Sequence, residues 1–140
     1  MKVAARRRKG YAHSLSAGRH TLIADEPRGK GGADTGPTPS QLLALSLASC
    51  TAITLEMYAD RKGWDVGDLE VEVDYAFGER ELPTRYDVML KLPEELSDEQ
   101  AERLREVAGK CPIHRALTGD VEIEDRIERM TTGATKSEPA

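Results

Sequence analysis

The residues of this chain best suited to chemistry are its two cysteines. Cys50 ends the apolar stretch "LASC" at Leu47–Cys50, and Cys111 opens a Cys-Pro motif in "KCPIHRAL" at Lys110–Leu117. Four interpretations are open: two buried core residues, a structural disulfide, metal ligands, or a redox pair. Cys50 alone favours the first interpretation, because a buried cysteine commonly behaves as a small hydrophobic side chain. The break at Pro112 favours a Cys111 side chain that reaches a cleft.

A metal site needs more ligands than these cysteines supply. Cys111 and His114 have the spacing of two zinc ligands, and Cys50, His13 or His20 would have to complete the set. The sequence contains no second closely spaced pair. We therefore expect no metal ion and no organic cofactor.

A redox pair makes demands on the fold. Burial raises the pKa of a cysteine, so a cation must oppose that effect if the attacking thiol is to ionise near neutral pH. The second thiol must lie close enough to condense with the sulfenic acid that oxidation forms. Arginines are frequent in the N-terminal segment, and Arg115 lies near Cys111. The spacing of the two cysteines does not show whether they meet.

Composition narrows the class of protein. The chain has 140 residues, of which 32% are charged and 39% hydrophobic, and this is typical of one soluble globular domain. We predict that domain over residues 1–130 and a flexible tail over residues 131–140. The net charge of −5 argues against general affinity for nucleic acid or an anionic membrane. The basic run Arg6–Lys9 is interpreted as a solvated strand edge.

The hydropathy pattern predicts the location of the protein. No apolar stretch follows the N-terminal charges as it would in a secretion signal. The uncharged segment at 35–55 has an apolar part of about 14 residues, which is short for a membrane span. We expect a cytoplasmic protein with no membrane partner, and in that compartment paired cysteines usually bind metal or do redox chemistry.

The strands that must position these residues are predicted in three groups. Three short strands come first, separated by glycines: Val3–Arg8, Tyr11–Ser16 and His20–Asp25. After a Gly- and Pro-rich loop and a helix, apolar and charged residues alternate over 69–77, and a second strand covers 86–92, which predicts a hairpin with one wet face. A last strand is suggested by Val121, Ile123 and Ile127.

The first predicted helix runs from Pro39 to about Lys62, with Thr38 as its N-cap and Gly63 as its stop. Its apolar side chains do not keep to one face, so the helix should be buried on all sides. One small domain has little material to cover it. We therefore infer a homodimer in which a second copy covers the remaining face.

The second predicted helix opens with the capping box Ser97–Gln100. Its buried stripe contains Ala101, Leu104, Ala108 and Cys111, which places Cys111 on the buried face at the end of this helix. Pro112 then begins a short turn that continues through Leu117.

Taken together, these motifs resemble a known family. The segment "DEPRGKGGADTGPTPSQLLALSLASCTAITLEMYADRKGW", followed by "KCPIHRAL", resembles the OsmC/Ohr family of osmotically induced and organic-hydroperoxide-resistance proteins, and most closely its OsmC-like branch. The resemblance extends from about Gly18 to Ile127. Its specific part is the GPTP segment, helix and cysteine combined with the distant Cys-Pro.

The resemblance implies an α+β, OsmC-like fold in which antiparallel sheets pack with two main helices in an intertwined homodimer. It implies a thiol-dependent peroxidase that reduces organic hydroperoxides. Cys50 would be the peroxidatic cysteine and Cys111 the resolving one, with a dithiol of the lipoyl type as reductant. An N-terminal arginine would stabilise the thiolate and the peroxide oxygen; Arg8 is the first candidate and Arg19 the second.

The sequence departs from the family pattern at one position. Members of the Ohr type carry a glutamate just after the proline that opens the central helix, and it bonds the arginine; here Ser40 and Gln41 follow Pro39. The arginine would then be placed differently or held by an acidic residue of the preceding loop: Asp25, Glu26 or Asp34. His114 and Arg115 are further candidates to contact thiolate or substrate, or else serve as helix-capping or interface residues.

Two alternatives to the peroxidase stay open at this point. The thiols would act on some other electrophile, or as a stress sensor, with little peroxidase activity; the missing glutamate motivates this alternative. Otherwise the protein would be a non-enzymatic dimer in which both cysteines are merely packed.

Overall fold

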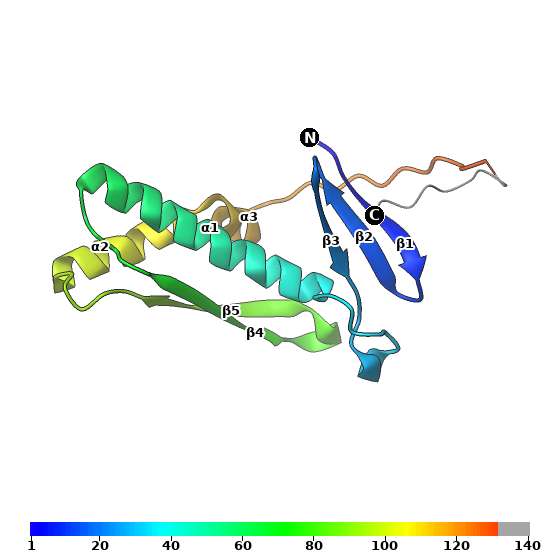
Figure 1. Ribbon diagram of the computed structural model, residues 1–140, viewed down its shortest axis with the longest axis horizontal. Helices are drawn as coiled ribbons and strands as arrows, with labels where there is room; N and C mark the ends of the chain where they lie inside the picture. The colour runs from blue at the N-terminus through cyan, green and yellow to red at the C-terminus, as the bar shows by residue number, and fades with distance from the viewer. Residues whose placement is uncertain (132–140) are drawn as a thin grey trace. The chain divides into compact units, whose positions relative to one another are not determined.

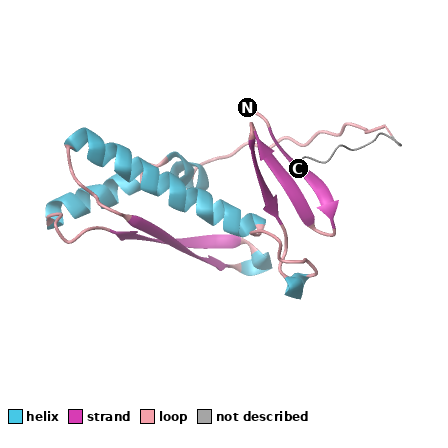
Figure 2. Ribbon diagram, in the orientation of Figure 1, coloured by secondary structure: helices cyan, strands magenta, loops and turns pink. Residues whose placement is uncertain are grey.

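The computed structural model describes residues 1–131 and forms helices and antiparallel sheets (Figures 1 and 2). Over the described residues the chain divides into two compact units, one made of residues 1–41 with 122–131 and the other of Leu42–Val121. The predicted α+β class is therefore confirmed. The single domain expected over 1–130 stays a prediction, and the expected tail lies, from residue 132 on, outside the described residues.

The first unit contains a three-stranded antiparallel meander. The strands are β1 (Val3–Lys9), β2 (Ala12–Ala17) and β3 (His20–Ala24), in the order β1-β2-β3. Gly10 and Gly18 occupy the tight turns with φ near +60°, a conformation that glycine adopts without strain. The three predicted strands are thus confirmed within a residue or two.

The loop after β3 is organised around the buried carboxylate of Asp25, which is 2% exposed. This carboxylate accepts hydrogen bonds from the backbone N–H groups of Glu26 (2.7 Å), Ala33 (3.3 Å) and Thr35 (3.1 Å), and from the Thr35 hydroxyl (2.7 Å). Gly36 is required in the same loop, because a side chain there would overlap the carbonyl of Ile23. The loop therefore has a defined conformation that leads into the next helix.

We predict an acid-sensitive contribution of Asp25 to stability. The Thr35 hydroxyl, opposed by burial and helped by the backbone N–H groups of Thr35, Glu26 and Ala33, holds the pKa of Asp25 below its ordinary value of 3.8. The contribution is complete above that value and is lost as pH falls through the lower folded pKa. In urea unfolding, Asp25→Asn should lower the midpoint at pH 7 and remove this part of the acid dependence. The exposed Asp68→Asn is the control and should follow the wild type; identical curves for both variants would contradict the prediction.

The second unit packs helices on a two-stranded hairpin. Its strands are β4 (Glu70–Phe77) and β5 (Pro83–Lys91), and its helices are most of α1 (Pro39–Lys62) with α2 (Asp98–Ala108) and α3 (Pro112–Thr118). Figure 1 shows α1 running along the hairpin with α2 beside it. The core joins these elements through Leu55 and Ala59 of α1 with Leu104 and Val107 of α2.

Local signals explain where α1 begins and ends. Thr38 and Gln41 form a reciprocal cap: the Gln41 N–H donates to Thr38 Oγ1 (3.1 Å) and the Thr38 N–H donates to Gln41 Oε1 (2.9 Å). Pro39 occupies the first turn, where its missing N–H costs nothing. Gly63 has φ of +71°, the left-handed conformation that commonly ends a helix. The predicted bounds of this helix are confirmed.

Within the described part of the second unit, only one face of α1 is buried. The buried positions follow a helical repeat and comprise Ala44, Leu47, Thr51, Leu55 and Ala59. Large apolar side chains remain exposed on the rest of the helix: Leu43, Leu45, Ile53 and Met57. The described residues of the second unit therefore do not bury this helix on all sides.

The length of α1 bears on the membrane expectation. Its 24 residues reach a mean hydropathy of 1.5 over the most apolar window, so among the described helices α1 is long and apolar enough to cross a membrane. The apolar part of about 14 residues predicted from the sequence therefore does not exclude a membrane span for the whole of α1. Central helices of soluble proteins meet the same criterion.

Two sequence-based predictions are wrong. Cys111 does not lie on α2, because that helix ends at Ala108 and a turn through Gly109 and Lys110 separates them; its predicted burial is nevertheless observed. No strand forms over residues 119–131, where Val121, Ile123 and Ile127 are exposed. Their alternation lacks a neighbouring strand in the described part of the chain to supply hydrogen-bonding partners.

Candidate functional site

Cys50 lies in the middle of α1, near the buried stripe rather than within it. Leu47 precedes it by one helical turn and Thr51 follows it, and both of these residues are buried. The Cys50 side chain is partly exposed and its sulfur is an unpaired thiol. The Cys50 side chain is therefore less shielded than a fully packed core residue.

Cys111 is held at the start of α3. Pro112 occupies the first position of that helix, and Cys111 is its N-cap residue, whose Sγ accepts a hydrogen bond from the His114 N–H at 3.3 Å. Pro112 has a φ suited to a helix start, so the Cys-Pro dipeptide sets the cap geometry. The Cys111 side chain is 0% exposed. The second thiol is therefore fixed and shielded where the first is accessible.

The structure brings the two thiols together, 61 residues apart in sequence. The two thiols lie close enough for each to affect the pKa of the other. Burial raises the pKa of Cys50, and the neighbouring Cys111 adds to this, while the Ile113 N–H and the Thr54 hydroxyl oppose it. The largest influences on this thiol include no cation.

Cys111 has the opposite tendency. Burial also acts to raise its pKa, but hydrogen bonds from the His114 N–H, the Cys50 thiol and the Thr51 hydroxyl together outweigh burial and lower it. Thr51 is 1% exposed, and its Oγ1 lies 3.8 Å from Cys111 Sγ. In the second unit taken alone, Cys111 is thus the thiol more readily ionised, and Cys50 is the one more readily reached.

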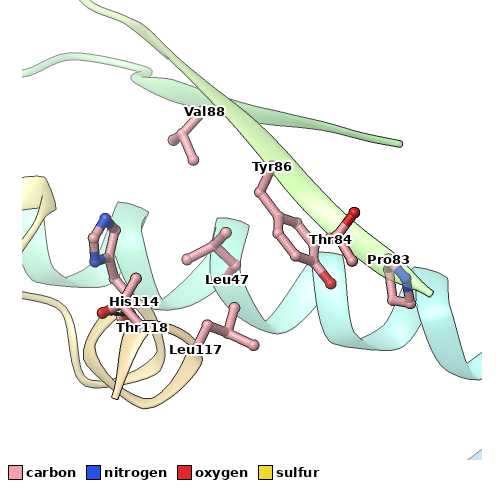
Figure 3. Close-up of a pocket in the computed structure, with 8 residues that line it drawn as sticks. All are labelled: Leu47, Pro83, Thr84, Tyr86, Val88, His114, Leu117 and Thr118. Carbon is pink, nitrogen blue, oxygen red and sulfur yellow. Dashed lines mark hydrogen bonds between the residues drawn. The ribbon is translucent and has the colours of Figure 1, made fainter. Parts of the chain in front are cut away.

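A cavity of about 380 Å³ lies one helical turn from both cysteines (Figure 3). Its eight lining residues come from three elements: Leu47 of α1; Pro83, Thr84, Tyr86 and Val88 of β5; and His114, Leu117 and Thr118 of α3. Leu47 precedes Cys50 by three positions, and His114 follows Cys111 by three. The lining carries no Asp, Glu, Lys or Arg, so the cavity suits a neutral, largely apolar ligand.

The other predicted site residues are placed as follows. Gln41 caps α1 through its side chain, and Ser40 lies in the first turn of that helix. His114 lines the cavity and gives its backbone N–H to Cys111, while Arg115 is exposed on α3. Arg8 and Arg19 are exposed residues of the first unit, whereas both cysteines belong to the second. The assignment of either arginine to the thiolate stays a prediction.

The acidic residues proposed to hold the arginine also have defined surroundings. Asp25 uses both carboxylate oxygens within its own loop, as described above. This leaves Glu26 and the exposed Asp34 as the better candidates for an arginine partner. Over residues 1–131, no three His, Cys, Asp or Glu side chains are grouped as metal ligands would be.

Sequence reasoning missed Thr51 and the cavity-lining residues of β5. Thr51 directly follows Cys50, but its donation to Cys111 depends on how α1 and α3 approach each other. Thr84, Tyr86 and Val88 share one face of a strand with a period of two, a pattern visible in the sequence. The sequence does not show that this face of β5 lines a cavity together with α1 and α3.

The fold and this thiol pair define a class of protein: an α+β protein with an accessible and a shielded cysteine held together by two helices. The profile of the OsmC-like protein family matches residues 31–125. The chain therefore belongs to the OsmC-like family, as the sequence motifs predicted.

Solved structures agree with this membership. The OsmC-like protein from Mycoplasma pneumoniae is similar with a TM-score of 0.74 at 17% identity, over 84% of this chain and 86% of that one. The organic hydroperoxide resistance protein OhrB of Bacillus subtilis has a TM-score of 0.56 at 26% identity, over 86% and 92%. An organic hydroperoxide resistance protein from Legionella pneumophila has a TM-score of 0.57 at 24% identity, over 85% and 90%.

No curated protein gives a significant match to the chain. The family and these neighbours support a redox or peroxide-resistance role.

Proposed function

We propose that this protein is a thiol-dependent peroxidase that reduces organic hydroperoxides with Cys50 and Cys111. The observation that carries the proposal is the pairing of the two thiols, in which Cys50 is accessible and Cys111 is buried beside it. Relatives named for organic hydroperoxide resistance support the same substrate class.

The reaction follows from this division of roles. The Cys50 thiolate attacks the terminal oxygen of the hydroperoxide; the O–O bond breaks, Cys50 becomes a sulfenic acid, and a proton completes the alcohol product. The Cys111 thiolate then attacks the Cys50 sulfur, which forms the disulfide and releases hydroxide, protonated to water. A dithiol reduces that disulfide by exchange, and we propose one of the lipoyl type.

The first step needs a cation near Cys50. Burial raises the pKa of this thiol, and the hydrogen bonds from Ile113 and Thr54 oppose that effect without a charge. An arginine beside the sulfur would favour the thiolate and stabilise the charge that develops on the peroxide oxygen. Arg8 remains the first candidate and Arg19 the second.

The cavity next to the thiols is proposed to receive the organic group of the substrate. Leu47, Val88 and Leu117 provide apolar surface, and the volume is within the range of small-molecule sites. Hydrogen peroxide gains nothing from such a surface. We therefore expect a preference for alkyl and aryl hydroperoxides.

The uncovered face of α1 supports a homodimer. Leu43, Leu45, Ile53 and Met57 are exposed on a helix whose other face is core, and exposed apolar patches of this kind commonly mark interfaces. We propose that a second copy covers them. Sedimentation at micromolar concentration should give twice the chain mass of 15.4 kDa, and a monomer would contradict this. The proposed chemistry suits the cytoplasm, where thiols are kept reduced.

The proposal is tested by following the loss of cumene hydroperoxide with dihydrolipoamide as reductant. We expect catalytic turnover, and slower turnover with hydrogen peroxide under the same conditions. Absence of turnover together with rapid alkylation of Cys50 near pH 7 would favour the second candidate, a protein whose thiols act on other electrophiles. The absence of a carboxylate at Ser40 and Gln41 motivates that candidate. Slow alkylation of both native thiols would indicate merely packed cysteines.

We predict that Thr51 positions and activates the resolving thiol. Thr51→Val removes a hydroxyl that lowers the pKa of Cys111, so less thiolate is present at pH 7. Disulfide formation after one equivalent of peroxide should slow about 3–10-fold at pH 7, as expected for the loss of one hydrogen bond. Because loss of the hydroxyl raises the pKa of Cys111, the pH profile of disulfide formation should move to higher pH. At alkaline pH, where Cys111 is ionised in both proteins, the rates of Thr51→Val and the wild type should become equal.

Stopped-flow measurement across pH tests this prediction. Thr51→Ser keeps the hydroxyl and should restore the wild-type profile. A Thr51→Val profile that superimposes on that of the wild type would show that the hydroxyl has no such role.

A further inference from the structure

The proposed reduction of a hydroperoxide requires a proton for the oxygen that departs with the organic group. An alkoxide is strongly basic, so the O–O bond breaks faster when a positioned acid protonates that oxygen as it departs. The organic group is proposed to lie in the cavity beside the thiols, and the departing oxygen is bonded to it. The acid is therefore to be sought among the residues that line this cavity.

One of the eight lining side chains is suited to this role. Histidine is the side chain that ordinarily gains and loses a proton near neutral pH. His114 is the only histidine in the lining, and the other seven residues are Leu, Val, Pro, Thr or Tyr. The Tyr86 hydroxyl is shielded from water and is not available to a ligand. His114 is therefore the candidate that the cavity offers.

The imidazole of His114 is available to a ligand. Within the residues that the structure describes, neither of its ring nitrogens has a hydrogen-bond partner, and neither is shielded from water as the Tyr86 hydroxyl is. Figure 3 shows the ring pointing from α3 into the space that Leu47 and Val88 also line. The ring can therefore exchange a proton with a molecule in the cavity.

The first turn of α3, which carries His114, also faces both sulfurs. The His114 N–H lies 3.3 Å from Cys111 Sγ, and a hydrogen bond from the Ile113 N–H opposes the effect of burial on the pKa of Cys50. Leu47, which precedes Cys50 by one turn of α1, lines the cavity together with His114. A hydroperoxide whose organic group fills the cavity and whose terminal oxygen meets Cys50 thus has its O–O bond beside this turn.

We infer that His114 is a catalytic residue, the general acid that protonates the departing oxygen. The Cys50 thiolate bonds to the terminal oxygen, the O–O bond breaks, and its electron pair stays on the oxygen that carries the organic group. The imidazolium of His114 gives a ring proton to that oxygen and releases the alcohol, while Cys50 keeps the transferred hydroxyl as a sulfenic acid. The imidazole then regains a proton from water. This inference rests on the proposed function and adds a residue to it.

The test compares two peroxides that differ in their leaving group. Cumene hydroperoxide releases an alkoxide, whereas peroxybenzoic acid releases a carboxylate, which departs readily without an acid. Full-length Cys111→Ser protein isolates the first step, and quenched samples treated with dimedone give the rate at which Cys50 is oxidised. In this background, His114→Gln should slow oxidation by cumene hydroperoxide about 100-fold or more, and oxidation by peroxybenzoic acid less than about 3-fold.

Two further variants separate proton transfer from packing. His114→Asn has a smaller side chain without a titrating ring and should show the same selectivity as His114→Gln. Leu117→Ala is the matched control, because it changes the wall of the same cavity and removes no proton donor; it should alter both rates by the same factor. Equal slowing of both peroxides by the His114 variants, slowing of neither, or the same selectivity in Leu117→Ala would overturn the inference.

The same measurements distinguish failure of this inference from failure of the proposed function. If cumene hydroperoxide does not oxidise Cys50 while His114 is intact, the proposed function fails and the inference fails with it. If Cys50 is oxidised at the same rate in the presence and absence of the His114 imidazole, the inference alone fails and the peroxidase stands.

Discussion

Cys50→Ser should abolish catalytic reduction of cumene hydroperoxide, lowering turnover at least about 1,000-fold, as removal of a nucleophile does in other enzymes. The serine hydroxyl is not ionised near neutral pH and cannot reproduce the thiolate. The measurement is peroxide loss with dihydrolipoamide in excess. Circular dichroism should show an intact fold, because Cys50 is partly exposed and the substitution creates no cavity.

In the same assay, Cys111→Ser should show a different defect from that of Cys50→Ser. Steady turnover stops, but about one equivalent of peroxide per chain is consumed, and the sulfenic acid at Cys50 becomes trappable with dimedone. The double variant should consume none. Consumption of one equivalent by Cys50→Ser, and none by Cys111→Ser, would reverse the assigned roles; this outcome has a physical basis, because Cys111 is the thiol whose pKa is lowered.

Leu55→Ala should destabilise the protein by about 2–5 kcal/mol, the range for large-to-small substitutions in a packed core. Leu55 is 0% exposed and contacts the cluster in which α1 packs on α2 through Leu104 and Val107. Since α2 leads directly to the turn that carries Cys111, loosening this contact should also slow formation of the Cys50–Cys111 disulfide. Chemical denaturation at fixed protein concentration measures the first effect.

The matched control is Ile53→Ala, two residues earlier on the same helix but 50% exposed. In the isolated chain its effect should be within about 0.5 kcal/mol, as is usual at the surface. If the proposed dimer forms, Ile53→Ala should lower the free energy of unfolding at protein concentrations where the wild type is dimeric, and this loss should shrink as both proteins are diluted toward the monomer. A loss for Ile53→Ala as large as that for Leu55→Ala, at every concentration, would contradict the assignment of the core to the Leu55 face.

Local elements of this protein were readable from its sequence because local interactions determine them. The bounds of α1 follow from the Thr38 and Gln41 cap, from Pro39 and from the left-handed Gly63. The alternation in β4 and the capping box at Ser97 likewise act over a few residues. Where a pattern needed a distant partner, prediction failed: Val121, Ile123 and Ile127 alternate like a strand but find no neighbour in the described chain.

The candidate site likewise combines features that the sequence determines locally with features that depend on distant parts of the chain. The sequence by itself determined that the chain has two cysteines on segments of distinct character, and its motifs were sufficient to predict the OsmC-like family. Only the tertiary structure decided that Cys50 is partly exposed and Cys111 buried, that Thr51 donates to Cys111, and that residues of α1, α3 and β5 enclose a cavity. These properties depend on the approach of α1, α3 and β5, which are far apart in sequence, and no local rule determines that approach.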